Sequence, residues 1–421
     1  MTAVRRYVVP GRVELVGKHV DYGGGRSLTC AVTFSMRATA SVIPEAVLRV
    51  RQRGSRDVVE VPFLASAAPT KVRWSPYVAA VARRVARDFP DAVGRSGVEV
   101  RLSSDVPPAA GVSSSTALTV ALARAVADGL ALRDQAAFAE HAGTPLTFAE
   151  YVAAIETGSA YGPFGGDAGV GVRGGAQDHV AICCARAGQV GQFSYIPARE
   201  EGWVPWPTDR VLAIGVSGAR ASKTGNAQRA YNRAADAVRW LVSQWNGMTY
   251  RNDGTLAAAL ASGPDAAERL ARIAESADGA PVSGPYLVKR LAQFREECDA
   301  IVPGVAEALR TGDLARVGAL VDRSQALAEH ALENQIPETV HLAQTARALG
   351  ADAASAFGAG FGGAVWAMVP AASIEDFLDR WRAAYVSAFP SRAAKAKFLQ
   401  TMPGPPAREV SRRDHRRRRR G

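Results

Sequence analysis

Hydroxyl-bearing residues crowd the start of an expected helix in the run VPPAAGVSSSTALTVALARAV, from 106 to 126. Pro107 and Pro108 stop the β-like run before it, and only small residues separate them from the serines. Backbone N–H groups at a helix start are unpaired and carry the positive end of the helix dipole, so they attract an anion. We therefore predict a phosphate-binding loop here, with a well-capped core helix as the alternative. The expected phosphate contacts are Gly111, Val112, Ser113, Ser114, Ser115 and Thr116.

This loop differs from the common phosphate cradle, because no Gly-Lys-Ser/Thr sequence occurs in the chain. Two glycine-bearing segments accompany it, PGRVELVGKHVDYGGG from 10 to 25 and ADAASAFGAGFGGAVWAMV from 351 to 369. Each predicts two strands joined at glycines that permit a tight turn or a close backbone approach. The acidic segment GGAQDH, from 174 to 179, lies between them along the chain.

The order of these four segments resembles the GHMP kinase superfamily, and its galactokinase branch most closely. There the first motif reads approximately GRVNLIGEHTDYNGG, the second PxGGGLSSSA and the third GGGFGG or GAGFGG. The QD pair of GGAQDH looks more like the heptose and fucose kinase branches, which carry GGxQDQ. The resemblance spans roughly residues 7 to 370. It implies an α+β GHMP kinase fold of two lobes, with the active site in the cleft between them, and an enzyme that uses ATP and Mg²⁺.

The resemblance also implies roles for single residues. Asp178 aligns with the catalytic aspartate, which would accept or polarise the proton of the attacking hydroxyl. Arg12 aligns with the arginine of GRVN and would favour the ionised nucleophile while pairing with Asp178 or phosphate. Ser115 and Glu156 are the expected Mg²⁺ ligands, although Glu156 also fits a surface helix. The backbone at Gly360 and Gly362, with Gly358 and Gly363, is expected to pack against the serine loop beside the nucleotide.

The sugar-binding positions of the family fall on His19 and Asp21 in KHVDY, on Gly175, and on the segment that holds Arg220 and Gln228. Lys18 departs from the family, which has a glutamate there, and Glu14 replaces the asparagine of GRVN. An ammonium prefers a phosphate or a carboxylate to a hydroxyl. We therefore expect the sugar to carry an anionic distal group, such as a heptose or octose phosphate or a uronic acid. Alternatively, Lys18 faces solvent and plain galactose binds.

The predicted function is phosphorylation of a sugar at its anomeric hydroxyl. Two further hypotheses stay open. The protein is a sensor that binds sugar and ATP without catalysis, or it is a kinase for a non-sugar alcohol such as mevalonate or homoserine. A single screen of sugars by ADP release separates them.

Length and composition are compatible with this reading. A chain of 421 residues exceeds the usual size of a single core, and we expect an N-terminal domain over 1–203, a C-terminal domain over 204–400 and a disordered Arg-rich tail over 401–421. No apolar run is long enough to span a membrane, and four cysteines without metal-ligand spacing fit the cytoplasm. The tail carries +6 of the net charge of +11. We expect no membrane or nucleic-acid partner, and the sequence predicts no oligomeric state.

Hydrophobic periodicity gives the coarse elements. We expect strands at 4–9, 13–16, 47–51, 58–63, 98–102, 180–184, 211–216 and 364–368. We expect helices at 76–89, 115–130, 227–245, 285–301, 314–333, 338–349 and 374–389.

Overall fold

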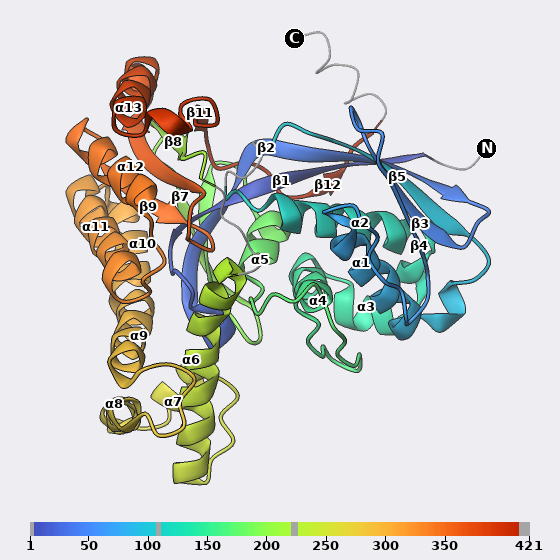
Figure 1. The fold of residues 1–421 in the computed structure, drawn as a ribbon, viewed down its shortest axis with the longest axis horizontal. Coiled ribbons are helices and arrows are strands. Elements are labelled where there is room, and N and C mark those ends of the chain that lie inside the picture. The colour runs from blue at the N-terminus through green and yellow to red at the C-terminus, as the bar shows by residue number, and fades with distance from the viewer. Residues whose placement is uncertain (1–3, 107–110, 220–225, 412–421) are drawn as a thin grey trace.

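Two antiparallel-rich sheets, each covered by helices, make up the architecture (Figure 1). The computed structural model describes residues 4–106, 111–219 and 226–411, and for 226–231 it describes the backbone only. Arg220 therefore lies outside the described residues, and Gln228 is placed by its backbone alone.

The first sheet runs in the order β12-β1-β2-β5-β3-β4, with β6 paired to β2 and β7 paired to β6. All pairs are antiparallel except β3 with β5. Its strands are β1 Arg5–Val16, β2 Arg26–Ile43, β3 Val47–Gln52, β4 Val58–Pro62, β5 Gly97–Ser104, β6 Gln189–Ser194, β7 Arg199–Pro205 and β12 Arg408–Glu409. The strands expected at 4–9 and 13–16 are one strand, β1, with irregular pairing to β2 between Pro10 and Arg12.

Five helices cover one face of this sheet (Figure 1). They are α1 Ser75–Asp88, α2 Ser114–Gly129, α3 Ala136–Ala142, α4 Pro145–Thr157 and α5 Gln177–Cys184. Their apolar residues form one core with the alternating buried positions of β3 and β4. The strand expected at 180–184 is wrong, because this stretch completes α5. A short apolar run has no period that separates strand from helix.

The second sheet has the order β11-β8-β10-β9 and is antiparallel throughout. Its strands are β8 Arg210–Val216, β9 Ala353–Phe357, β10 Ala364–Pro370 and β11 Lys397–Thr401. One face of β8 and β10 shares a core with the end of β1 and the first half of β2, and the other packs on α12 and α13. The long strands β1 and β2 therefore tie the two sheets together.

Helices dominate the rest of the C-terminal half. They are α6 Asn226–Thr249, α7 Leu256–Leu260, α8 Ala266–Ser276, α9 Gly284–Glu296, α10 Val302–Thr311, α11 Leu314–His330, α12 Pro337–Ala348 and α13 Ile374–Ala388, with a π-helical turn (η4) at Glu297–Ile301. Short 3₁₀ turns lie at Asp21–Gly23, Pro90–Ala92, Leu132–Asp134, Ala371–Ser373 and Pro390–Arg392. Helices α6 to α9 form their own core, into which Val20 of the β1–β2 connection inserts.

The C-terminal segment corrects the expected tail. Residues 402–411 return to the first sheet, where β12 pairs with β1 at its edge. The N–H of Gly404 donates to the carbonyl of Ala31 at 2.8 Å, and that of Ala407 donates to Ile182 at 2.8 Å. A disordered tail from residue 401 is therefore wrong for 401–411, and the arginine run from 412 lies outside the described residues.

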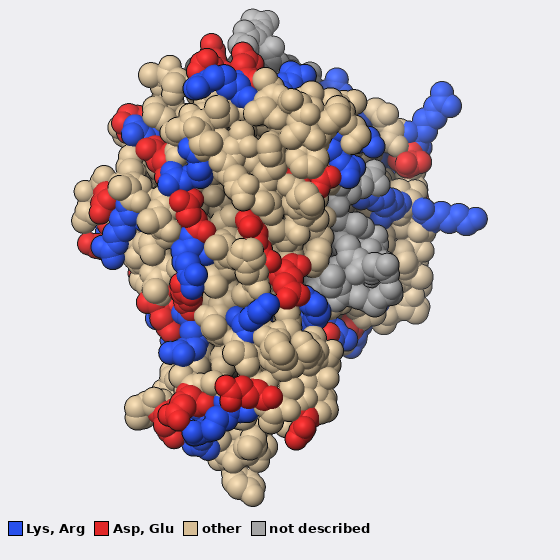
Figure 2. Space-filling model, turned by 60° about the vertical axis from the view of Figure 1, so that its left-hand side comes forward, with Lys and Arg blue, Asp and Glu red and all other residues tan. Residues whose placement is uncertain are grey.

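Acidic and basic side chains are interspersed over the face that Figure 2 shows, with no broad field of one sign. Among the described residues, no helix combines the length and the apolar content needed to cross a bilayer.

Candidate functional site

A cavity of about 810 Å³ brings together segments that are far apart in the sequence. Its walls come from β1 and the turn after it, from the start of α2, from α4 and α5, and from the glycine turn after β9. The lining includes Arg12, Glu14, His19, Asp21, Tyr77, Gly111, Ser113–Thr116, Glu156, Gly175, Gln177, Asp178, His179, Gly358 and Ala359.

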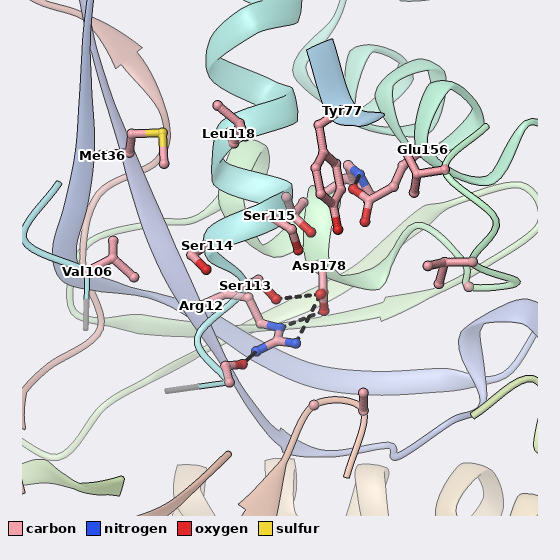
Figure 3. Close-up of a pocket in the computed structure, with 18 of the residues that line it drawn as sticks. Arg12, Met36, Tyr77, Val106, Ser113, Ser114, Ser115, Leu118, Glu156 and Asp178 are labelled. Atoms are coloured by element: carbon pink, nitrogen blue, oxygen red, sulfur yellow. Dashed lines mark hydrogen bonds and ion pairs between the residues drawn. The ribbon is translucent and has the colours of Figure 1, made fainter. Parts of the chain in front are cut away.

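An ion pair lies at the centre of this cavity (Figure 3). The Arg12 guanidinium donates from Nε to Oδ1 of Asp178 at 2.6 Å and from Nη2 to Oδ2 at 3.0 Å. Its Nη1 donates to the carbonyl of Gly111 at 2.7 Å. Because both groups are held by two parallel bonds, the carboxylate of Asp178 is fixed in place, yet its side chain keeps about 20% exposure toward the cavity.

The serine loop begins α2 in an unusual way. Ser113 occupies the N-cap with φ 57°, but its hydroxyl makes no capping bond. Instead its Oγ donates to Oδ2 of Asp178 at 2.5 Å. The amides of the first turn of α2 are therefore left without a side-chain cap at the cavity wall, which is the arrangement that attracts an anion.

Ser115 lies on the other side of this helix start, facing Tyr77 and Glu156 (Figure 3). Burial raises the pKa of Tyr77 to about 12, while its hydrogen bond with Ser115 opposes that rise. Glu156 is buried beside His179, whose Nε2 lies 3.2 Å from Oε2 of the carboxylate. Thr119 also donates to that oxygen, at 3.5 Å. No group of three or more His, Cys, Asp or Glu side chains forms a metal cluster within the described ranges.

The opposite side of the cavity holds His19 and Asp21. Asp21 is buried, which raises its pKa, and its Oδ2 accepts from the N–H of Gln177 at 3.2 Å. A Cβ on Gly175 would meet that same oxygen at 2.4 Å, so Gly175 is needed to admit Asp21. The ring of His19 lies between the Tyr22 hydroxyl, 3.2 Å from Nδ1, and the carbonyl of Ala359, 3.3 Å from Nε2.

Two family models each match a segment in one half of the chain. The model of the GHMP kinases N terminal domain matches residues 76–186, and that of the GHMP kinases C terminal matches residues 305–387. The chain belongs to the GHMP kinase superfamily. A third model, the galactokinase galactose-binding signature, matches residues 3–42 and places this GHMP kinase in the galactokinase branch.

Relatives of similar sequence and solved structures of similar fold match most of the chain. The galactokinase of Actinobacillus pleuropneumoniae is 24% identical over 89% of this chain and 87% of its own length. The galactokinase of Lacticaseibacillus paracasei is 25% identical over 91% of this chain and 90% of its own. The structure of Lactococcus lactis galactokinase complexed with galactose superposes with a TM-score of 0.76 at 21% identity, covering 97% of this chain and 95% of that one. The structure of L. major mevalonate kinase in complex with R-mevalonate has the same fold at a TM-score of 0.57 and 16% identity, covering 96% of this chain and 97% of that one.

The expected α+β fold of two lobes and the expected family are thereby confirmed, and the GHMP kinase is a galactokinase-like sugar phosphotransferase. ATP follows from the family. The roles of the individual site residues stay predictions, although the cavity gathers most of them.

Lys18 is placed differently from our expectation. Its side chain is 1% exposed and does not line the cavity. Its Nζ donates to the hydroxyls of Ser324 and Ser355, each at 2.8 Å. Glu297 accepts from Ser324 at 2.5 Å, so a buried carboxyl on η4 accounts for the position of the ammonium. The idea that Lys18 meets an anionic end of the sugar is therefore wrong for this GHMP kinase.

Three of the expected nucleotide contacts do not reach the cavity. The side chain of Val112 is buried in the core shared by the two sheets, and its carbonyl accepts from the N–H of Arg12 at 3.3 Å. Gly360 and Gly362 shape the turn after β9 with positive φ, and a Cβ on Gly360 would meet the Asn334 carbonyl at 2.4 Å. Gly358 and Ala359 are the residues of this turn that line the cavity.

Polar residues of the cavity that our sequence analysis did not name as site residues include Glu14, Tyr77, Gln177 and His179. Glu14 could have been found, because it lies two residues after Arg12 on a strand, and alternate residues share one face. Gln177 and His179 flank Asp178 in the sequence. Tyr77 carries no local signal, since its place depends on how α1 packs against α2.

Proposed function

We propose that this GHMP kinase transfers the γ-phosphate of ATP to the anomeric hydroxyl of galactose or a closely similar neutral sugar. The observation that carries the proposal is the Arg12–Asp178–Ser113 constellation beside the uncapped start of α2, within the cavity that His19 and Asp21 also line. The galactose-binding signature over 3–42 contains Arg12, His19 and Asp21 and supports galactose as the sugar.

The start of α2 would hold the phosphates of ATP through its free amides and through Ser114 and Thr116. Ser115 and Glu156 offer oxygen donors on one wall of the cavity, and oxygen donors are what Mg²⁺ takes from proteins, alongside phosphate oxygens. A bound Mg²⁺ would neutralise charge that develops on the phosphates. His179 and Thr119 hold the Glu156 carboxylate in position for that contact.

Asp178 would orient the attacking hydroxyl. As the new P–O bond forms and the bond to the β-phosphate oxygen breaks, the hydroxyl proton passes to or toward Asp178, and ADP leaves. Arg12 fixes the carboxylate and stabilises negative charge on the attacking oxygen. Asp178 accepts bonds from both Arg12 and Ser113, and we propose that it acts mainly by orientation and by its field, with proton transfer late.

A screen by coupled ADP detection tests this function. The sugars are galactose, glucose, galacturonic acid, glucuronic acid and a heptose 7-phosphate, with ³¹P NMR to identify a sugar 1-phosphate as product. We expect the highest kcat/KM for galactose or another neutral hexose. A higher kcat/KM for an anionic sugar would overturn the proposal, and so would binding of sugar and ATP without release of ADP.

A further inference from the structure

Glu14 is a buried carboxyl that the proposed mechanism does not use. It lies on β1 two residues after Arg12, so both side chains leave the same face of the strand. The side chain is 4% exposed and lines the cavity together with Arg12, His19, Asp21 and Asp178.

Only one of its two oxygens has a partner. The amide Nε2 of Gln177, the residue next to Asp178, donates to Oε2 of Glu14. Oε1 is buried and has no hydrogen-bond partner among the residues that the structure describes. A buried acceptor without a partner destabilises a protein, so a native site that keeps one calls for an explanation such as a ligand or a water.

The surroundings of Glu14 indicate which ligand would suit it. Burial raises the pKa of this carboxyl to about 8, and the neighbouring charge of Asp178 raises it further, whereas Lys18, Arg12 and the bond from Gln177 act in the opposite direction. A carboxyl that keeps its proton can both donate to and accept from a hydroxyl. An ionised one repels a carboxylate or a phosphate. In both states the group matches a hydroxyl of a neutral sugar.

We propose that Oε1 of Glu14 binds a hydroxyl of the sugar other than the reacting one, so that Glu14 determines specificity for neutral sugars. This inference rests on the proposed function. It replaces the role that the sequence suggested for Lys18: the chain places a carboxyl on the sugar side of the cavity and keeps its ammonium away from it.

A competing explanation lies in the sheet itself. Thr29 is paired directly with Glu14 across β1 and β2, and its hydroxyl is also buried without a described partner. A rotation of Thr29 or one trapped water would then satisfy both groups, and Glu14 would be purely structural.

Protein–substrate double-mutant cycles separate the two explanations. The variants are Glu14→Asn, which carries the residue of the related GRVN motif, and Glu14→Gln, which keeps the size of the side chain. The substrates are galactose and its 2-, 3-, 4- and 6-deoxy derivatives. We expect Glu14→Asn to lower kcat/KM for galactose roughly 10–100-fold, with the KM of ATP within about 2-fold of wild type. For one deoxy sugar the loss should fall below about 3-fold, because that hydroxyl is already absent.

Glu338→Gln is the matched control. Glu338 is 8% exposed, is bound by Arg392 at 2.9 Å, and lies on α12 outside the cavity lining, so its kinetics should match wild type. Equal losses on all five sugars in both Glu14 variants, or a lowered Tm with unchanged kinetics that Thr29→Val reproduces, would overturn the inference. If wild type phosphorylates no neutral sugar, the proposed function itself fails. If wild type phosphorylates galactose and no cycle shows coupling, only the role of Glu14 fails.

Discussion

At the scale of single residues, the geometry of the site depends on hydrogen-bonded groups that hold each other in place. Arg12 binds Asp178 through two nitrogens and the Gly111 carbonyl through the third. A lysine carries the same charge but has one nitrogen, so it can hold the carboxylate or the loop, and not both in the same geometry.

We therefore expect Arg12→Lys to lower kcat on the order of 100-fold, because the charge that faces the attacking oxygen is displaced. The KM of ATP should change little. Steady-state kinetics with the best sugar of the screen measure both. Arg186→Lys is the control, since Arg186 pairs with Glu200 on the surface. Retention of most of the wild-type kcat by Arg12→Lys would contradict the role we propose for the guanidinium.

Glu14 also makes a prediction about pH. Its pKa is about 8 in the folded protein and about 4.5 when unfolded, so between these values the folded state holds a proton that the unfolded state has released. The stabilising contribution is complete below pH 4.5 and is lost as pH rises through 8, with a limiting slope of about 1.4 kcal/mol per pH unit.

Wild type should therefore lose stability relative to Glu14→Gln as pH rises from about 5 to about 8. Urea unfolding of both proteins at several pH values measures this difference in the free energy of unfolding. The contributions of the other titrating groups are common to both proteins and cancel in the difference. The charged or polar groups that act on Glu14 include Arg12, Lys18, Gln177 and Asp178. The Thr29 hydroxyl lies opposite it on β2, and Tyr195 interacts with its charge. A difference that is constant with pH, or that grows in favour of wild type, would show that the carboxyl stays ionised when folded.

At the scale of elements, the close approach of two segments sets the sugar side of the site. The loop before α5 passes very near to the turn after β1. A Cβ on Gly175 would therefore collide with the carboxylate of Asp21. We expect Gly175→Ala to displace the Asp21 carboxylate and to raise the KM of the sugar on the order of 10–100-fold, with the KM of ATP unchanged. Gly247→Ala in α6, where a Cβ meets nothing within 4 Å, is the control. Equal changes in both KM values would instead mean a general loosening of the cavity.

Two helices of the site lie where periodicity predicts them, since α1 and α2 begin within one residue of the expected starts. Helix α4 was not among the expected helices, and part of α5 was expected as a strand. The secondary structure of short apolar runs was harder to predict. The run at 180–184 was expected as a strand but is helical, because five residues do not define a period. The position of Lys18 could not be predicted locally, since its partners Ser324 and Ser355 are more than 300 residues away in the sequence. The family motif gave the positions of Arg12 and Asp178, but a departure from that motif, such as Glu14, acquires its meaning only from its neighbours in space.

At the scale of the whole molecule, the network around Lys18 joins the two halves of the chain. The turn after β1 is bound there to η4, α11 and β9 through Glu297, Ser324 and Ser355. Lys18→Met would leave the Glu297 carboxyl buried without its cation, and we expect a loss of about 3–5 kcal/mol in the free energy of unfolding. Denaturant unfolding measures it, and Lys18→Met combined with Glu297→Gln should recover part of the loss.

Since Lys18 does not reach the cavity, the ratio of kcat/KM for galactose and galacturonic acid should be the same in Lys18→Met as in wild type. A changed ratio would show that Lys18 acts on the sugar.

The returning C-terminal segment gives a second prediction at this scale. A chain that ends at residue 411 retains every contact of β12 described above, whereas one that ends at 401 loses the bonds to Ala31, Ile182 and Arg6. We expect the first truncation to leave Tm within about 2 °C of wild type and the second to lower it by several degrees. Thermal unfolding followed by circular dichroism measures both. Equal Tm values for the two truncations would mean that the pairing of β12 adds nothing to stability.

The pairing of β12 with β1 also has a consequence for how the protein is made. Strand β1 (Arg5–Val16) leaves the ribosome well before β12 (Arg408–Glu409), the strand that pairs with its free edge, because residues 17–407 are made between them. During synthesis the growing chain therefore carries an open β-edge, of the kind that invites pairing with other chains. The N-terminal lobe can begin to assemble early, but the edge of β1 gains this partner only after β12 has been made.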